Sequence, residues 1–210
     1  MNTYDPLIAA SPGTGLDYVP SYWTATAGAS PRDDGPLHGA TDVEVVIIGG
    51  GYTGLSCAYH LAHDFGIRAI VLEANRPGWG CSGRNGGFAR AAIGRHSFGK
   101  MLELWGRDTA RRAFAQALAA LENLRSMMRE GGIGCDAREV GHLKIAHRPS
   151  RAAALAAEAE LLQREFGYPA EFLSGAKVRA EHLGGPQSHG AMRFPDAIAV
   201  HPLKLAFGVL

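Results

Sequence analysis

Cysteine is scarce in this chain, and the long apolar runs of membrane proteins are missing. Its 210 residues include three cysteines, Cys57, Cys81 and Cys135, which are too few and too scattered for a disulfide framework. No run of about 18 apolar residues could form a transmembrane helix. The first 40 residues also lack the basic start and apolar core of a secretory signal. We therefore expect a cytoplasmic protein with no membrane attachment.

An excess of one charge is also lacking. The formal net charge is +1, from 21 basic and 20 acidic residues, so no bulk attraction to nucleic acid is expected. The nucleophile, zinc-protease and phosphate-loop motifs of other enzyme classes are absent as well. His60 and His63 lie three residues apart, but no cysteine or acidic ligand set accompanies them. We therefore expect no metal site.

Glycine is abundant instead, with 28 residues that gather in clusters. The first cluster, Gly49–Gly54, follows the β-branched run Val43–Ile48, which is typical of a buried parallel strand. A helix pattern over 53–63 and a second apolar run over 67–72 come next. Strand, helix and strand in this order predict an α/β fold with a right-handed, Rossmann-like βαβ unit that binds FAD or NAD(P).

The spacing of the first cluster suits a dinucleotide. In Gly49-x-Gly51-x-x-Gly54, the first glycine permits a tight turn, the second lets the backbone approach a diphosphate, and the third lets the helix pack on the strand. The diphosphate would sit at the helix N-terminus. Glu73 closes the second strand, where its carboxylate can accept hydrogen bonds from the ribose hydroxyls and would repel the extra phosphate of NADP.

A second glycine cluster, Gly78–Gly87, favours FAD over NAD, because a simple nicotinamide dehydrogenase does not need it. Its small residues would let backbone N–H groups surround an anion or approach a flat ring. Ser82 and Asn85 add short hydrogen-bonding side chains. Arg84 could face a phosphate, the edge of the flavin or a substrate carboxylate; the plainer alternative is a surface loop with a solvated arginine.

The remaining chain predicts a mixed α+β region that begins a substrate domain. We expect helices from Ser97, from a cap at Asp108, and from a cap at Ser150 to about Phe166. Strands are expected at 141–146, 170–173 and 190–194, with a short helix capped by Ser174 and another starting at Pro202. The expected division is an irregular arm with aromatic anchors Tyr18, Tyr22 and Trp23 (1–40), an FAD-binding region with a long helix (41–135), a partial substrate domain (136–200) and a helix returning to the FAD domain (201–210).

Three stretches resemble a known family. Val46–Ser56, Val71–Ala74 and above all the Ser-Gly-Arg-Asn-Gly-Gly loop within Gly78–Phe88 are similar to the D-amino-acid-oxidase-like FAD oxidoreductases. The nearest branch is that of the γ-glutamylputrescine oxidases. The resemblance extends over most of the chain from about residue 20.

This resemblance implies an enzyme that oxidises the C–N bond of a small-molecule amine or amino acid. A hydride would pass to the flavin, water would hydrolyse the imine, and oxygen would be reduced to hydrogen peroxide. The resemblance names no catalytic residue, and it leaves the oligomeric state open. The cofactor-binding residues that it implies are Gly49, Gly51, Tyr52, Thr53, Gly54, Glu73, Ala74, Gly80, Ser82, Arg84, Asn85 and Gly86.

Two departures from the family pattern qualify this expectation. Family members are much longer, and they return late in the chain to complete the sheet and cover the flavin. We therefore expect an incomplete fold, the N-terminal portion of such an oxidase or a truncated product. The segment Asp196–Val200 also differs from the usual pattern before His201-Pro202. An NAD-dependent dehydrogenase and a non-catalytic dinucleotide-binding fragment remain alternatives.

Overall fold

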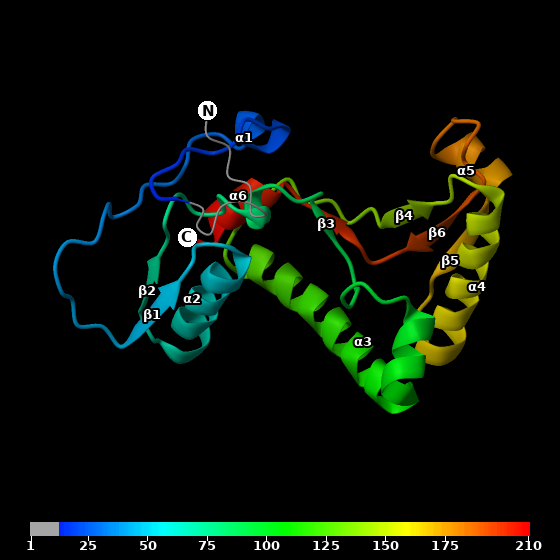
Figure 1. Cartoon of the computed structure of the whole chain (residues 1–210), viewed down its shortest axis with the longest axis horizontal. Helices are drawn as coiled ribbons and strands as arrows, with labels where there is room; N and C mark the ends of the chain where they lie inside the picture. The colour runs from blue at the N-terminus through cyan, green and yellow to red at the C-terminus, as the bar shows by residue number, and fades with distance from the viewer. Residues whose placement is uncertain (1–12) are drawn as a thin grey trace. The chain divides into compact units, whose positions relative to one another are not determined.

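The computed structural model describes residues 13–210 (Figure 1). The first twelve residues of the expected arm lie outside this range. Two compact units are formed, each from separate stretches of chain. Of the described residues, the first unit combines 13–87 with 128–136 and 200–210, and the second combines 88–127 with 137–199. Within the described residues, none of the helices is both long and apolar enough to cross a bilayer.

The first unit is built around a parallel strand–helix–strand element. Strand β1 (Val45–Ile48) pairs in parallel with β2 (Ala69–Leu72), and the connecting helix α2 (Tyr52–Phe65) lies beside them (Figure 1). Gly66 ends α2 in the left-handed conformation, with φ of 68°, which is the usual role of glycine after a helix. The structure thus confirms the α/β character that the sequence predicts.

The expectation that β1 is buried on both faces is wrong for the described residues. Ile47 faces α2, close to Gly54, whereas Ile48 on the opposite face is 88% exposed. Alternate residues of a strand point to opposite faces. Val46, on the same face as Ile48, is 50% exposed, so within residues 13–210 this face of β1 is largely open.

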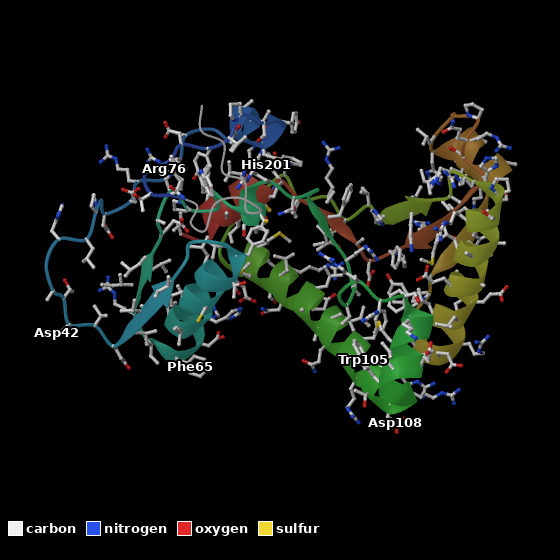
Figure 2. All side chains as sticks on the ribbon, viewed as in Figure 1. Asp42, Phe65, Arg76, Trp105, Asp108 and His201 are labelled. Carbon is white, nitrogen blue, oxygen red and sulfur yellow. The ribbon has the colours of Figure 1, made fainter. Side chains whose placement is uncertain are left out.

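Three short helices complete the first unit. They are α1 (Tyr22–Thr26), the 3-10 turn η1 (Cys81–Gly83) and α6 (Pro202–Gly208). As expected, α6 starts at Pro202, and the side chain of His201 (labelled in Figure 2) caps it by accepting a hydrogen bond from the Lys204 N–H. Leu203 of α6 is buried and lies beside Gly78 and Gly83. The second glycine cluster is therefore packed on α6.

The second unit contains an antiparallel sheet with helices beside it. Its strands β4 (His142–Ile145), β6 (Gly190–Phe194) and β5 (Glu171–Ser174) lie in that order, and β3 (Phe88–Ala89) pairs separately with β7 (Ile198–Ala199). Helix α4 (Pro149–Phe166) packs on β6 and β5, as Figure 1 shows, and α5 (Gly175–Glu181) follows β5. Ser174 caps α5, as predicted, by accepting from the Lys177 N–H.

Aromatic rings form the core of the second unit. The ring of Phe114 lies edge-on to those of Phe98, Phe166 and Tyr168, at centroid distances of 5.2–5.5 Å. Such edge-to-face contacts add about 0.5–1.5 kcal/mol each to the gain from burial. Phe98 and Phe114 belong to helix α3 (Phe98–Glu130). The long helix is therefore anchored in the second unit for most of its length.

This anchoring changes the expected division of the chain. The sequence places residues 88–127 in the FAD-binding region, but the structure groups them with 137–199 because the apolar face of α3 packs against α4 and the sheet. Only residues 128–136 of this stretch stay with the first unit. The two helices expected in this stretch are present, separated by Gly106, whose φ of 72° is not helical; the second helix starts directly after Gly106, before the expected cap at Asp108.

The predicted cap at Ser150 is wrong. Helix α4 begins two residues earlier than that cap implies, with Pro149 in its first turn and Arg148 at the cap position. Proline suits a first helical turn because it has no N–H to leave unpaired. The cap side chain of Arg148 makes no hydrogen bond to the helix.

Candidate FAD-binding site

The turn after β1 requires glycine at two positions. Gly49 has φ of 102°, and its N–H donates to the carbonyl of Leu72 on β2 at 2.7 Å. A Cβ on Gly54 would lie 2.0 Å from the carbonyl oxygen of Gly49 and 3.1 Å from Ile47. Only glycine at position 54 allows the first turn of α2 to come this close to the strand. These are the roles that the sequence spacing predicts.

The N-terminus of α2 presents unpaired backbone donors. Gly51 occupies the cap position without a side chain to accept a hydrogen bond. The N–H of Tyr52 donates to Ser82 Oγ at 2.9 Å. Within residues 13–210, no group accepts from the N–H of Thr53 or Gly54. Two free donors at the positive end of a 14-residue helix form a favourable position for a diphosphate.

Glu73 stands where the sequence places it, at the end of β2, and its carboxylate is already engaged. Oε2 accepts from the N–H of Gly50 at 2.7 Å, and Oε1 accepts from the N–H of Asn75 at 3.0 Å. Each carboxylate oxygen can accept a further hydrogen bond. Glu73 can therefore hold the turn and still receive ribose hydroxyls. The next residue, Ala74, accepts the N–H of Gly15 with its carbonyl at 2.9 Å.

The second glycine cluster folds back onto the first. The N–H of Gly78 donates to the carbonyl of Gly50 at 2.7 Å. A Cβ on Gly83 would lie 2.3 Å from the carbonyl of Gly78, and one on Gly87 would lie 2.4 Å from the carbonyl of Val200. The sequence singles out Gly80 and Gly86 in this cluster, yet the backbone depends more on Gly78, Gly83 and Gly87. Only contacts made in the folded chain reveal this difference.

Ser82 and Asn85 shape this loop as well as lining it. Ser82 Oγ receives the Tyr52 N–H, so the loop is fixed to the start of α2. The Asn85 side chain donates to the carbonyls of Cys81 and Ser82 and accepts the N–H of Gly87 at 2.8 Å. Its amide therefore closes the η1 turn. The structure therefore joins this loop to the first cluster.

Arg84 is exposed and lies over an aromatic ring. The centre of its guanidinium is 4.8 Å from the centroid of the Trp79 ring, and its Nε donates to the carbonyl of Gly80 at 3.2 Å. A cation at this distance is attracted to the ring face. The arginine is held in one orientation without an acidic partner among the described residues, so its charge is available to an anion.

The Tyr52 phenol has a structural role. Its hydroxyl donates to the carbonyl of Pro202 at 2.8 Å, which connects α2 to the start of α6. Burial raises the pKa of Tyr52 to about 12. The phenol therefore keeps its proton and cannot serve as a base at neutral pH.

The N-terminal arm is anchored on the second glycine cluster. Tyr18 donates its hydroxyl to the carbonyl of Pro77 at 2.7 Å, and Trp23 donates its indole N–H to the carbonyl of Asn85 at 2.9 Å. Trp79 in turn donates to the carbonyl of Asp17. Of the three expected anchors, Tyr18 and Trp23 act as such, whereas Tyr22 is 71% exposed. Trp79 is an anchor that the sequence did not single out.

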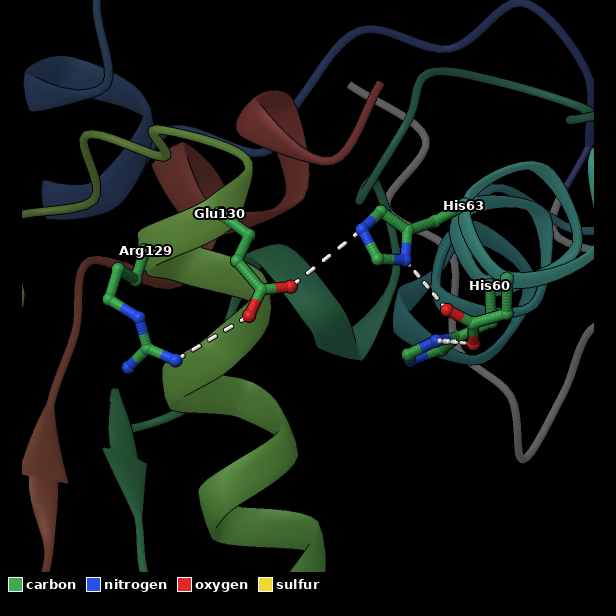
Figure 3. A network of polar contacts seen from close by, with 5 residues as sticks. His60, His63, Arg129 and Glu130 are labelled. Atoms are coloured by element: carbon green, nitrogen blue, oxygen red, sulfur yellow. Dashed lines mark hydrogen bonds and ion pairs between the residues drawn. The ribbon is translucent and has the colours of Figure 1, made fainter.

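His60 and His63 take part in an ion-pair network on α2 (Figure 3). Their Nδ1 atoms lie 2.9 and 2.6 Å from the two carboxylate oxygens of Asp64, and His63 Nε2 lies 3.7 Å from Glu130 at the end of α3. In the described part of the chain, no group of three or more potential ligands could hold a metal ion. Both histidines are paired with carboxylates.

Comparison with known proteins identifies the family. Residues 44–210 match the family described as FAD dependent oxidoreductase, known as DAO. The chain belongs to this family. It is 34% identical over 193 residues to gamma-glutamylputrescine oxidoreductase of Escherichia coli (strain K12), covering 91% of this chain and 44% of that protein. It is 31% identical to a probable oxidoreductase OrdL of Rhizobium meliloti (strain 1021), covering 82% of this chain and 40% of that protein.

Solved structures share the fold. An L-amino acid deaminase from Proteus vulgaris matches with a TM-score of 0.63 and 15% identity, covering 91% of this chain and 46% of that one. A glycine oxidase from Geobacillus kaustophilus matches with a TM-score of 0.58 and 24% identity, covering 80% and 43%. The chain thus spans less than half the length of these relatives.

Proposed function

We propose that the first unit binds the adenosine diphosphate part of FAD. We further propose that the chain is part of a cytoplasmic enzyme that oxidises a C–N bond. The twelve residues implied by the sequence all lie in this unit. They would act in three groups: the turn and first residues of α2, the acid at the end of β2, and the loop around η1. Membership of an FAD-dependent oxidoreductase family supports FAD over NAD.

The observation that carries this proposal is the pair of free N–H groups on Thr53 and Gly54. Gly51 and Gly54 have no side chains that could occupy this turn, and Ser82 accepts the neighbouring N–H of Tyr52. A diphosphate placed here would receive two backbone hydrogen bonds and the field of the α2 dipole. Bound FAD would supply the two-electron oxidation of the substrate. The residues of this chain would hold the cofactor and fix its orientation.

The substrate class follows from the names of the relatives. They include a gamma-glutamylputrescine oxidoreductase, glycine oxidases and L-amino acid deaminases. We infer a small amine or amino acid as substrate, with transfer of a hydride equivalent from the carbon next to nitrogen. The second unit, with its antiparallel sheet, would form part of the substrate domain. In the relatives, further substrate contacts would come from the part of their length that this chain does not cover.

Reconstitution with FAD tests this proposal directly. The purified chain is titrated with FAD, and binding is followed by quenching of flavin fluorescence and by the visible absorption of the bound flavin. NADH is titrated in parallel. We expect saturable binding of FAD and none of NADH. Binding of NADH without FAD would favour the dehydrogenase alternative and contradict the proposal.

A variant locates the cofactor within the site. Thr53→Pro removes one of the two free donors, and proline is tolerated in the first turn of a helix. The matched control is Ser150→Pro in the first turn of α4, which lies in the other unit. We expect weaker FAD binding only for the first variant. Equal affinity in both variants would place the diphosphate elsewhere.

A further inference from the structure

A pocket of about 750 Å³ lies wholly within the second unit and away from the proposed cofactor residues. It is bounded by the segment 90–99, by the end of β4 and by the first three turns of α4. Its volume is in the range of pockets that hold small organic molecules, roughly 300–1,000 Å³. The cofactor site described above uses none of its residues.

The charged side chains around this pocket are mostly cationic. Arg90, Arg95, Lys144 and Arg151 line it, and Glu158 is the only acidic residue among the lining residues. That carboxylate is paired with Lys144, at an Nζ–Oε2 distance of 3.1 Å. Among residues 13–210, no carboxylate pairs with the three arginines. Their charges are therefore left to attract an anion.

Two helices begin at the rim of the same pocket. Helix α3 begins at Phe98, which lines it, and α4 begins at Pro149, between the lining residues His147 and Arg151. The start of α4 has no side-chain cap, and no described residue accepts from the N–H of Ser150. The positive ends of both helix dipoles add to the field of the arginines.

The inner wall of the pocket is apolar. Phe98, Leu155 and Phe194 are almost fully buried beneath it, and Ile93 and Leu161 are partly exposed along it. The guanidinium of Arg90 lies 4.7 Å from the centroid of the Phe194 ring, so a cationic group and the apolar wall meet there. A ligand suited to both features carries an anionic head and an apolar body.

We propose that this pocket binds a small organic anion, with a carboxylate or phosphate group facing Arg95 and Arg151 and an apolar body against Ile93 and Leu161. The arginine fork donates to such oxyanions in pairs of hydrogen bonds. Burial of the apolar body would add to the affinity in proportion to the area removed from water. The proposal stands independently of FAD binding.

Calorimetric titration of the full chain with 4-phenylbutyrate tests the proposal. The neutral 4-phenylbutanamide has nearly the same shape without the charge, and inorganic phosphate has the charge without the apolar body. We expect the carboxylate to bind at least tenfold more tightly than either. Equal binding of the carboxylate and the amide would overturn the proposal, because the arginines would then contribute nothing. The titration needs no FAD, so its failure is distinct from failure of the cofactor proposal.

Two variants and a control place the probe in the pocket. Arg95→Gln and Arg151→Gln each remove one exposed guanidinium, and we expect about a tenfold loss of 4-phenylbutyrate affinity from each, the scale of a hydrogen bond to a charged group. Arg112→Gln removes an exposed arginine of α3 that does not line the pocket, and it should have no effect. Unchanged affinity in both test variants would show that the probe binds elsewhere and would overturn the assignment.

Discussion

The carboxylate of Glu73 accepts a hydrogen bond from the backbone N–H of Gly50, with an Oε2–N distance of 2.7 Å. This contact ties the end of β2 to the turn after β1, and the second oxygen of Glu73 holds the N–H of Asn75. The acid that the sequence assigns to a ribose therefore also shapes the turn that would receive the diphosphate. Loss of the carboxylate should affect both the fold and the cofactor.

The first prediction separates these two roles of Glu73. Glu73→Ala leaves the N–H groups of Gly50 and Asn75 without their acceptor, so we expect the free energy of unfolding to fall by about 1–3 kcal/mol. Glu73→Gln keeps an acceptor oxygen for one of these N–H groups and should lose less. Urea unfolding measures both. Glu44→Ala, an exposed acid just before β1, is the control and should change little. Equal losses for Glu73→Ala and Glu44→Ala would refute the structural role.

The second prediction concerns the close approach of α2 to β1. Gly54→Ala places a Cβ 2.0 Å from the carbonyl oxygen of Gly49, so the helix must move away from the strand. We expect the free energy of unfolding to fall by about 1–3 kcal/mol, the scale of overpacking. FAD binding should also weaken. Gly134→Ala is the matched control: Gly134 lies in the same unit as Gly54, and a Cβ there would meet no atom within 4 Å. FAD binding by Gly54→Ala at the unaltered affinity would contradict the diphosphate position.

The third prediction concerns the arm. Tyr18→Phe removes the hydroxyl that donates to the carbonyl of Pro77. The free energy of unfolding should fall by about 0.5–1.5 kcal/mol, the net value of one hydrogen bond. We expect faster hydrogen exchange in the segment that precedes α1, since this hydroxyl ties it to the glycine loop. Tyr22→Phe removes a hydroxyl from a side chain that is 71% exposed and should leave exchange unchanged. Identical exchange in both variants would show that the Tyr18 hydroxyl does not anchor the arm.

Local sequence patterns account for the elements but not for the contacts between them. The strands and α2 follow from apolar periodicity. The predicted cap at Ser174 is confirmed, because a short polar side chain precedes a helix there. Ser150 failed because the neighbouring Pro149 competes for the helix start, and proline is favoured in the first turn. In both cases the outcome depends on residues within one turn of the cap.

Contacts over long sequence separations were beyond such patterns. The spacing of Gly49, Gly51 and Gly54 indicates a dinucleotide turn, but nothing near Gly87 in the sequence reveals that the carbonyl of Val200 leaves no room for a side chain there. The grouping of residues 88–127 with 137–199 likewise depends on what the apolar face of α3 packs against. A hydrophobic stripe predicts that a helix packs, but it does not name the partner.

The last prediction uses the network in Figure 3. The hydrogen bond to Asp64 raises the pKa of His63 above 6.5. A raised pKa means that the folded chain binds the proton more tightly than the unfolded chain, so the contribution of His63 to stability is fully present below pH 6.5 and is lost as the pH rises through the raised pKa. In Asp64→Asn, the His63 pKa measured by NMR titration should fall toward 6.5. Glu171→Gln, an exposed acid of the second unit, should not move it. A His63 pKa that stays raised in Asp64→Asn would assign the shift to Glu130 instead.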